Sequence, residues 1–97
     1  MEVLLSITPK KFIYCAVNQF DRNQKIFLLE GTTLTSLGSI HIEDLAATLP
    51  GICYAKAIYN VKLVGSPKFL EPYVKKIKTQ EAQQYGFNKI EIGVEEQ

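Results

Sequence analysis

The residues best placed for chemistry in this 97-residue chain surround a Gly65-Ser66-Pro67 turn, between a short apolar run and an amphipathic segment. Gly65 permits a sharp turn, Ser66 can cap the amides of a new helix, and Pro67 suits the first helical position. Free amides at a helix start bind anions, and nearby lysines add positive charge. The turn therefore predicts an anion or nucleic-acid site. Its candidate residues are Thr8, Lys10, Lys11, Gly65, Ser66 and Lys68.

A second candidate surface is basic and extends the first along the segment that follows the turn. Lysines on one surface can track a nucleic-acid backbone, and aromatic rings can stack on bases. The lysines are Lys62, Lys68, Lys75, Lys76 and Lys78, and the rings are Phe69 and Tyr73. Glu71 and Glu81 dilute the charge. A capped helix with a solvated face is the simpler interpretation of both candidates.

Residues that could hold a metal or act as acids are scarce. Asp21 and Asp44 are the only aspartates, and the Glu43-Asp44 pair is typical of acids that a helix dipole favours. His41 is the single histidine, with no nucleophile in a recognisable motif beside it. We therefore expect no catalytic residues, no metal and no cofactor.

Composition indicates one small domain over residues 1–97. Eleven Lys and Arg residues nearly balance ten acids, so the chain lacks the overall positive charge of a dedicated nucleic-acid-binding protein. Cys15 and Cys53 lie in apolar segments without CxxC spacing, which predicts buried, reduced thiols. No apolar run reaches membrane-spanning length, and residues 1–7 lack the basic start of a signal peptide. We expect a cytoplasmic protein with no membrane partner.

The first thirty residues predict three strands. Residues 3–7 form a nearly continuous apolar run, typical of a central strand covered on both faces. Residues 12–17 are rich in β-formers, and a polar loop separates them from a third run at 26–29. Short links make these strands an antiparallel meander. Residues 30–39 are small and polar, so we expect a mobile connection there, with an extension of the third strand as the alternative.

The middle of the chain predicts helix. Apolar residues at helical spacing over 42–49 indicate an amphipathic helix that Ser39 caps and that Pro50 and Gly51 interrupt. Residues 52–59 are interpreted as a second helical segment, with a lead-in to the next strand as the alternative.

The last third predicts a strand, a helix and a strand. A buried strand is expected over 61–64, and a helix that Gly86 ends, with a kink at Pro72 or a regular start near Glu71. Alternation over 89–95 indicates a half-exposed edge strand. The order is β-β-β-α-β-α-β. A right-handed crossover then gives an α/β fold with a five-stranded mixed sheet of order 3-2-1-4-5.

That topology is the ribonuclease H-like fold, and three segments resemble the opening of RuvC-type Holliday-junction resolvases. In those proteins a strand ends in Gly-Ile-Asp-Pro-Gly, a second strand has the form Gly-Tyr-Ala-Val, and a third ends near a Gly. The matching stretches are VLLSITP at 3–9, IYCAV at 13–17 and KIFLLEG at 25–31. The resemblance implies a nuclease fold in which acids at the ends of the first and fourth strands hold two metal ions.

Those acids are missing from the matching positions. Thr8 stands in place of the aspartate of the first strand, and Val64, Gly65 and Ser66 stand where the fourth strand should end in an acid. Two divalent cations need several converging carboxylates to offset their mutual repulsion. The sequence therefore predicts a ribonuclease H-like domain with a degenerate active site.

Three functional hypotheses follow. The first is a non-catalytic accessory protein, of the kind that phages and other mobile elements carry, which binds a protein partner or a second copy of itself. The second is a RuvC-like protein that binds or processes nucleic acid through Lys10, Lys11 and the last helix. The third is a small-anion or nucleotide sensor between Thr8 and Ser66. Cleavage of branched DNA with magnesium, salt-dependent binding and light scattering distinguish these classes.

Overall fold

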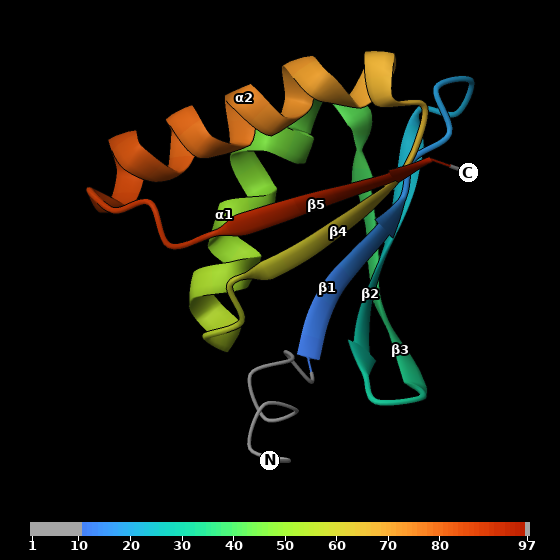
Figure 1. Cartoon of the computed structure of the whole chain (residues 1–97), viewed down its shortest axis with the longest axis horizontal. Helices are drawn as coiled ribbons and strands as arrows, with labels where there is room; N and C mark the ends of the chain where they lie inside the picture. Colours follow the sequence, from blue (N-terminus) through green and yellow to red (C-terminus); the bar gives the residue numbers. More distant parts are fainter. Residues whose placement is uncertain (1–10, 97) are drawn as a thin grey trace, which may run out of the picture.

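The structure is a computed structural model that describes residues 11–96. Its elements are β1 (Lys11–Ala16), β2 (Asn23–Glu30), β3 (Thr33–His41), the short 3-10 helix η2 (Ile42–Asp44), α1 (Leu45–Lys56), β4 (Asn60–Gly65), α2 (Pro67–Tyr85) and β5 (Glu91–Glu96). The strands form one five-stranded sheet in the order β3-β2-β1-β4-β5 (Figure 1). The predicted α/β class and strand order are confirmed.

The strands that fill this order differ from the predicted ones at the start of the sheet. The strand predicted at 3–7 lies outside the described residues. Of residues 12–17, expected as the second strand, 12–16 form the central strand β1 with Lys11, and 26–29 belong to β2. The third strand is β3, where a connection was predicted. That prediction was wrong because the Thr and Ser residues of this edge strand do not alternate with apolar ones.

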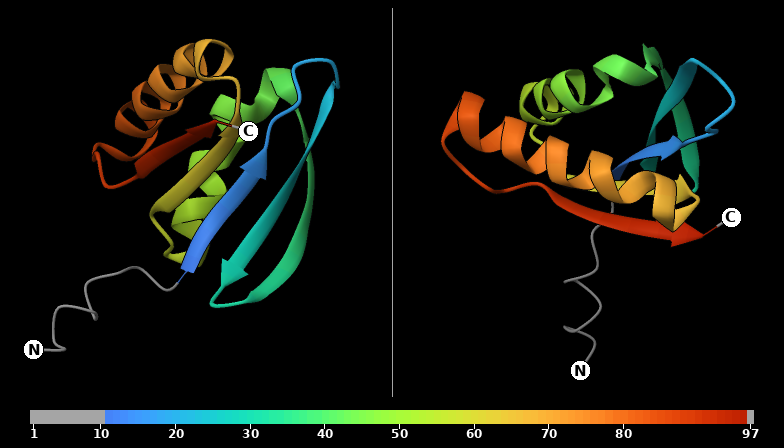
Figure 2. Two further views of the ribbon diagram at one scale, coloured as in Figure 1. Left: turned by 45° about the vertical axis from the view of Figure 1, so that its right-hand side comes forward. Right: turned by 90° about the horizontal axis from the view of Figure 1, so that it is seen from above.

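Parallel pairing at the centre of the sheet requires crossovers, which the helices supply. β1 pairs antiparallel with β2 and parallel with β4, and β4 pairs parallel with β5. The chain crosses from β3 to β4 through α1 and from β4 to β5 through α2. Both helices pack on the same face of the sheet, and the left view of Figure 2 looks onto the other face.

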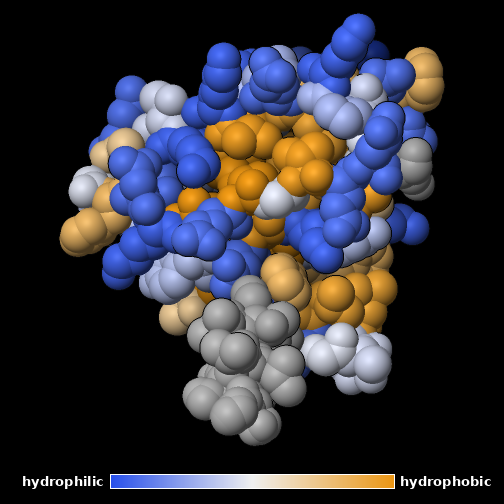
Figure 3. Space-filling model, in the orientation of Figure 1, coloured by the Kyte–Doolittle hydropathy of each residue, from blue (hydrophilic) through white to orange (hydrophobic). Residues whose placement is uncertain are grey.

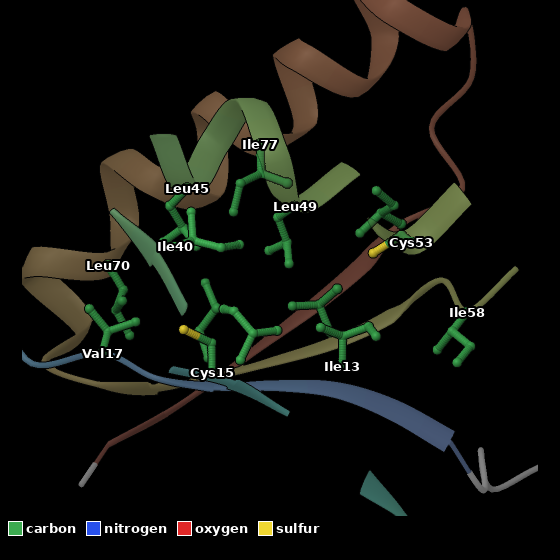
Figure 4. Close-up of a cluster of buried hydrophobic side chains, with 14 residues drawn as sticks. Ile13, Cys15, Val17, Ile40, Leu45, Leu49, Cys53, Ile58, Leu70 and Ile77 are labelled. Atoms are coloured by element: carbon green, nitrogen blue, oxygen red, sulfur yellow. The ribbon is translucent and has the colours of Figure 1, made fainter. Parts of the chain in front are cut away.

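The hydrophobic core lies between that covered face and the two helices. Ile13 and Cys15 point from β1 toward the helices, where Leu49 and Ile77 meet them (Figure 4), and all four are fully buried. A period of two along β1 places Ile13 and Cys15 on the covered face, and Val17, directly after the strand, joins them in the core. The residues between them therefore face the opposite way.

Helix α1 runs without a break through Pro50 and Gly51, where an interruption was predicted. Proline cannot donate the backbone hydrogen bond of its turn, so the helix has one bond fewer there. It ends at Ala57, which adopts a left-handed conformation with φ of 56°. The segment predicted as helix over 52–59 is therefore helical only as far as Lys56.

The starts of α1 and α2 also differ from the predicted caps. Ser39 lies in β3, and His41 caps η2 instead, where its Nδ1 accepts a hydrogen bond from the Glu43 amide at 3.2 Å. Pro67 is the first residue of α2 as predicted, but the Ser66 side chain makes no capping bond. The helix runs from Pro67 through Pro72 to Tyr85.

Gly86 ends α2 in a left-handed conformation with φ of 72°, which confirms the predicted cap. No helix in the part of the chain that the structure describes is long and apolar enough to span a membrane.

The two buried thiols predict a loss of stability at alkaline pH. Burial raises the pKa of Cys15 and of Cys53 from 9.0 to about 12, and for Cys53 the Glu81 carboxylate adds to the shift. Between these values the unfolded chain has lost the proton and the folded chain keeps it, so stability falls as pH rises. We expect about 3 kcal/mol of lost stability per thiol between about pH 8 and about pH 11.

Urea unfolding followed by circular dichroism measures this loss across the pH range. Cys15→Ala and Cys53→Ala should each remove one thiol's share of the slope, although each also costs core packing at neutral pH. An identical slope in wild type and both variants would contradict the assignment.

Candidate functional site

The parallel strands β1 and β4 end at the same edge of the sheet, which is where α/β proteins bind ligands. The Val17 amide donates a hydrogen bond to the Val64 carbonyl at 2.8 Å and closes this end of the strand pair. Beyond it lies a cavity of about 590 Å³, which we call the corner pocket. It is lined by Ala16, Val17, Asn18, Gln19, Phe20, Gly65, Ser66 and Phe69.

Gly65 sets the distance between the two strands at this corner. Its φ is 159°, and a Cβ at this position would lie only 2.7 Å from the Val17 carbonyl oxygen. Any larger residue would push the strand ends apart. The glycine therefore allows the backbones of β1 and β4 to come close together, and it also permits the turn into α2.

A buried amide fixes the loop on the other side of the corner pocket. The Gln24 side chain is 1% exposed, and its Oε1 accepts from the Asn18 amide at 2.9 Å. Its Nε2 donates to the carbonyls of Asn18 at 3.0 Å and of Asp21 at 2.8 Å. The Phe20 amide donates to Asn18 Oδ1 at 2.9 Å. These bonds hold the loop in one shape without any charged group.

Gln24 was not among the residues that the sequence predicted for this site. The sequence did contain a signal for it. Gln24 lies two residues before Ile26, so its side chain points to the same, covered face of β2. A polar side chain at such a position must find hydrogen-bond partners.

The corner pocket is lined by amides, a hydroxyl and two phenyl rings, with no carboxylate among them. Across residues 11–96, no three or more His, Cys, Asp or Glu side chains gather as a metal site would require. Two-metal phosphoryl transfer needs converging carboxylates to hold its ions. The donor set of the corner pocket does not fit that chemistry.

The structure brings together only part of the predicted anion site. Gly65 and Ser66 lie at the corner pocket, with Lys68 in the first turn of α2 beyond it, while Thr8 and Lys10 lie outside the described residues. Lys11 begins β1, at the end of the strand away from the pocket, and its Nζ lies 3.5 Å from Glu30 Oε2. The structure therefore places Lys11 apart from Gly65 and Ser66, because the strand that reaches the corner starts at Lys11.

Lys75 and Lys76 lie elsewhere, about two turns further along α2. They border a shallow groove of about 330 Å³ between the helices, which Glu43 also lines. Lys76 Nζ lies 5.4 Å from the centre of the Tyr73 ring. At about 1.5 Å per residue, these lysines are roughly 15 Å from Ser66 along the helix. The two predicted basic groups therefore do not form one site.

A second candidate surface is the face of the sheet that α1 and α2 leave uncovered. Strand register sets Tyr14 opposite Phe27, and Phe12 opposite Leu29, which in turn faces Leu34. The Tyr14 and Phe27 rings lie 6.4 Å apart. We call these five side chains, from β1, β2 and β3, the open face.

Four of the five are half-buried by one another, and Leu34 is 52% exposed. Figure 3 shows apolar side chains gathered toward the centre and the lower right of that view, with hydrophilic ones around them. The sequence contained a signal for this surface. Residues 12–17 and 26–29 are apolar at both parities, which is typical of strands covered on both faces. Within residues 11–96 the helices cover only one face.

No protein-family model and no curated protein matches this chain. A solved structure from Bacteroides thetaiotaomicron, described as a protein with an actin-like ATPase fold and unknown function, matches over 95% of this chain with a TM-score of 0.60. The identity is 15%, so the likeness concerns the fold alone, and the match covers 36% of that longer chain. The actin-like ATPase fold belongs to the ribonuclease H-like group of folds. This chain has a ribonuclease H-like fold. Its resemblance to RuvC-type resolvases stays a prediction.

Proposed function

We propose that this chain is a non-catalytic ribonuclease H-like domain that acts by binding another protein chain through its open face. The observation that carries the proposal is the mismatch between sequence and packing in β1 and β2. Residues 12–16 of β1 and 26–29 of β2 are apolar on both faces, but the helices cover one face only. Covering the remaining aromatic and aliphatic surface is favourable in water, which makes the open face a binding surface.

The corner pocket supports the non-catalytic part of the proposal. The pocket lies at the edge of the sheet where other α/β proteins bind ligands. The polar side chains that line it are Asn18, Gln19 and Ser66, and none of these is an acid. We expect no cleavage of branched or single-stranded DNA and no ATP hydrolysis in the presence of magnesium or manganese. Metal-dependent turnover by the purified chain would contradict this part of the proposal.

The binding part predicts that a charge on the open face abolishes partner capture. Leu34→Lys places an ammonium at the exposed margin of the face, where a bound partner would strip it of water. We expect the amount of specifically retained protein to fall at least tenfold, since about 1.4 kcal/mol of lost affinity is enough. Mass spectrometry of proteins retained by the immobilised chain measures the loss.

Phe87→Lys is the matched control for this experiment. Phe87 is 56% exposed, close to the exposure of Leu34, but it lies after α2 and outside the open face. Its variant should retain the same proteins as wild type. Identical retained sets for wild type, Leu34→Lys and Phe87→Lys would count against the open face.

A small-anion or nucleotide sensor is the second candidate, and the corner pocket is the observation that favours it. The pocket opens beside the first turn of α2, whose Ser66 side chain leaves the helix amides uncapped. Amides at a helix start attract phosphate groups. A rise in melting temperature with nucleotide or inorganic phosphate, absent with chloride, would favour this function over protein binding.

A further inference from the structure

We infer that the partner of the open face is a second copy of this chain, with the two sheets packed face to face about a two-fold axis. The inference rests on the proposed function, because it names the occupant of the same surface. A two-fold interface joins one patch to itself, so the patch must be compatible with its own copy in shape and charge.

The open face is compatible with its own copy in charge. The five open-face side chains come from three adjacent strands and carry no charge: Phe12, Tyr14, Phe27, Leu29 and Leu34. Two such surfaces can pack against each other as the inner faces of a sheet sandwich do at a spacing of about 10 Å, with the Lys62 ammonium, 5.1 Å from the centre of the Phe12 ring, at the margin of the contact. The hydroxyl of Tyr14 and the polar rim can stay solvated.

Positive and negative side chains are equal in number around the open face, which favours self-association over binding of a strongly charged partner. Lys62 lies next to Tyr14 in the register, and its Nζ is 3.2 Å from Glu95 Oε2. Strand alternation puts Lys25 and Glu91 on the same side of the sheet, one of each sign. A face with two lysines and two glutamates neither repels its own copy nor selects an acidic or basic protein.

The two edge strands of the sheet are less suited to self-association than the open face. The outer strand β5 carries Glu91, Glu95 and Glu96, so pairing it with its own copy would bring like charges together. The other outer strand, β3, has a register irregularity opposite Ile26 and Phe27, and Gly38 adopts φ of 104°. Charges and bulges are the devices that prevent edge pairing. Within the described residues, the five open-face side chains themselves carry no charge.

The size of the face predicts a weak, reversible dimer. The whole uncovered side of the sheet, of which the open face is the apolar part, has five strands at about 4.8 Å spacing and six residues at about 3.3 Å each, which gives roughly 500 Å² per copy. Stable interfaces bury about 800 Å² per partner, so this one lies below the standard size. We expect a dissociation constant on the order of ten micromolar.

Sedimentation velocity of the full chain from about 1 to about 500 µM tests the inference across the range that this affinity requires. We expect wild type to shift from monomer to dimer. Leu34→Lys should raise the dissociation constant at least tenfold, and Phe27→Lys should leave a monomer throughout. Phe87→Lys should dimerise as wild type does. Circular dichroism melts confirm that each variant is folded, and Leu34→Lys carries the test if Phe27→Lys does not fold.

The outcomes separate this inference from the proposed function. A wild type that stays monomeric throughout, but captures another protein in a manner that Leu34→Lys abolishes, overturns the dimer and leaves the protein-binding face in place. A monomer that captures nothing through the face overturns both. In a third outcome, Leu34→Lys leaves the dimer unchanged and Phe87→Lys weakens it. The interface then lies outside the open face, and the inference is overturned.

Discussion

Replacing Glu81 with alanine should lower the free energy of unfolding by about 3 kcal/mol. This is a large effect for a charged residue among the polar residues of a helix. The Glu81 side chain is fully buried. Its Oε2 accepts hydrogen bonds from Tyr54 Oη at 2.6 Å, from the Lys89 amide at 2.8 Å and from the Ile90 amide at 3.1 Å. Truncation leaves these donors buried or half-buried without an acceptor. Urea unfolding measures the loss.

Glu81→Gln is the matched control, because one amide oxygen can take the place of Oε2 and keep its three bonds. We expect it to cost only about 1 kcal/mol, for the lost charge on those bonds. Burial, and then the hydrogen bond to Glu81, raise the pKa of Tyr54, so its hydroxyl remains a donor well above neutral pH. Equal losses for Glu81→Ala and Glu81→Gln would show that the bonds do not carry the effect.

Amide hydrogen exchange offers a local test of the same contact. The carboxylate ties the end of α2 to the backbone that leads into β5, through the amides of Lys89 and Ile90. Both amides should exchange faster in Glu81→Ala than in Glu81→Gln, beyond the change expected from global stability alone. This carboxylate therefore connects the end of α2 to the start of β5.

Replacing Gly65 with alanine should cost about 2 to 3 kcal/mol, because the new Cβ meets backbone rather than a mobile side chain. The site of conflict is the Val17 carbonyl oxygen, 2.7 Å from the ideal Cβ position. Relieving the conflict requires the ends of β1 and β4 to separate, which strains the bond from the Val17 amide to the Val64 carbonyl. Urea unfolding at neutral pH measures the cost.

Gly93 provides the control for this substitution. It lies in β5, and a Cβ there would meet nothing within 4 Å. Gly93→Ala should change stability by less than about 0.5 kcal/mol or raise it slightly, since alanine restricts the unfolded chain. If Gly65→Ala proves as mild as Gly93→Ala, close strand approach does not require the glycine.

The second half of the fold was predictable because its signals are local. The apolar run at 61–64, the turn to Pro67 and the stop at Gly86 each specify a neighbouring bond or dihedral angle, and each appears in the structure as predicted. The helix through Pro50 was not predictable in this way. Tertiary packing keeps that segment helical, since Pro50 and Leu49 are both buried.

The first half was harder because its strands depend on distant partners. β3 is an edge strand of Thr and Ser residues, and its pairing with β2 defines it rather than any apolar alternation. Assigning 3–7 to the first strand moved the predicted corner from Asn18 to Thr8. Glu81 was interpreted as a surface acid that dilutes the charge of α2, but its place in the core follows from contacts with residues far along the chain.

The order of the strands has a consequence for the chain as it leaves the ribosome. The β2 and β3 hairpin is local and can form early, whereas β1 must wait for β4, about fifty residues later. Until β5 is synthesised, β4 would present an unpaired backbone edge flanked by Val61 and Leu63, an apolar template that nascent chains can pair with wrongly. Pairing with β5 therefore closes this edge of β4 to wrong partners.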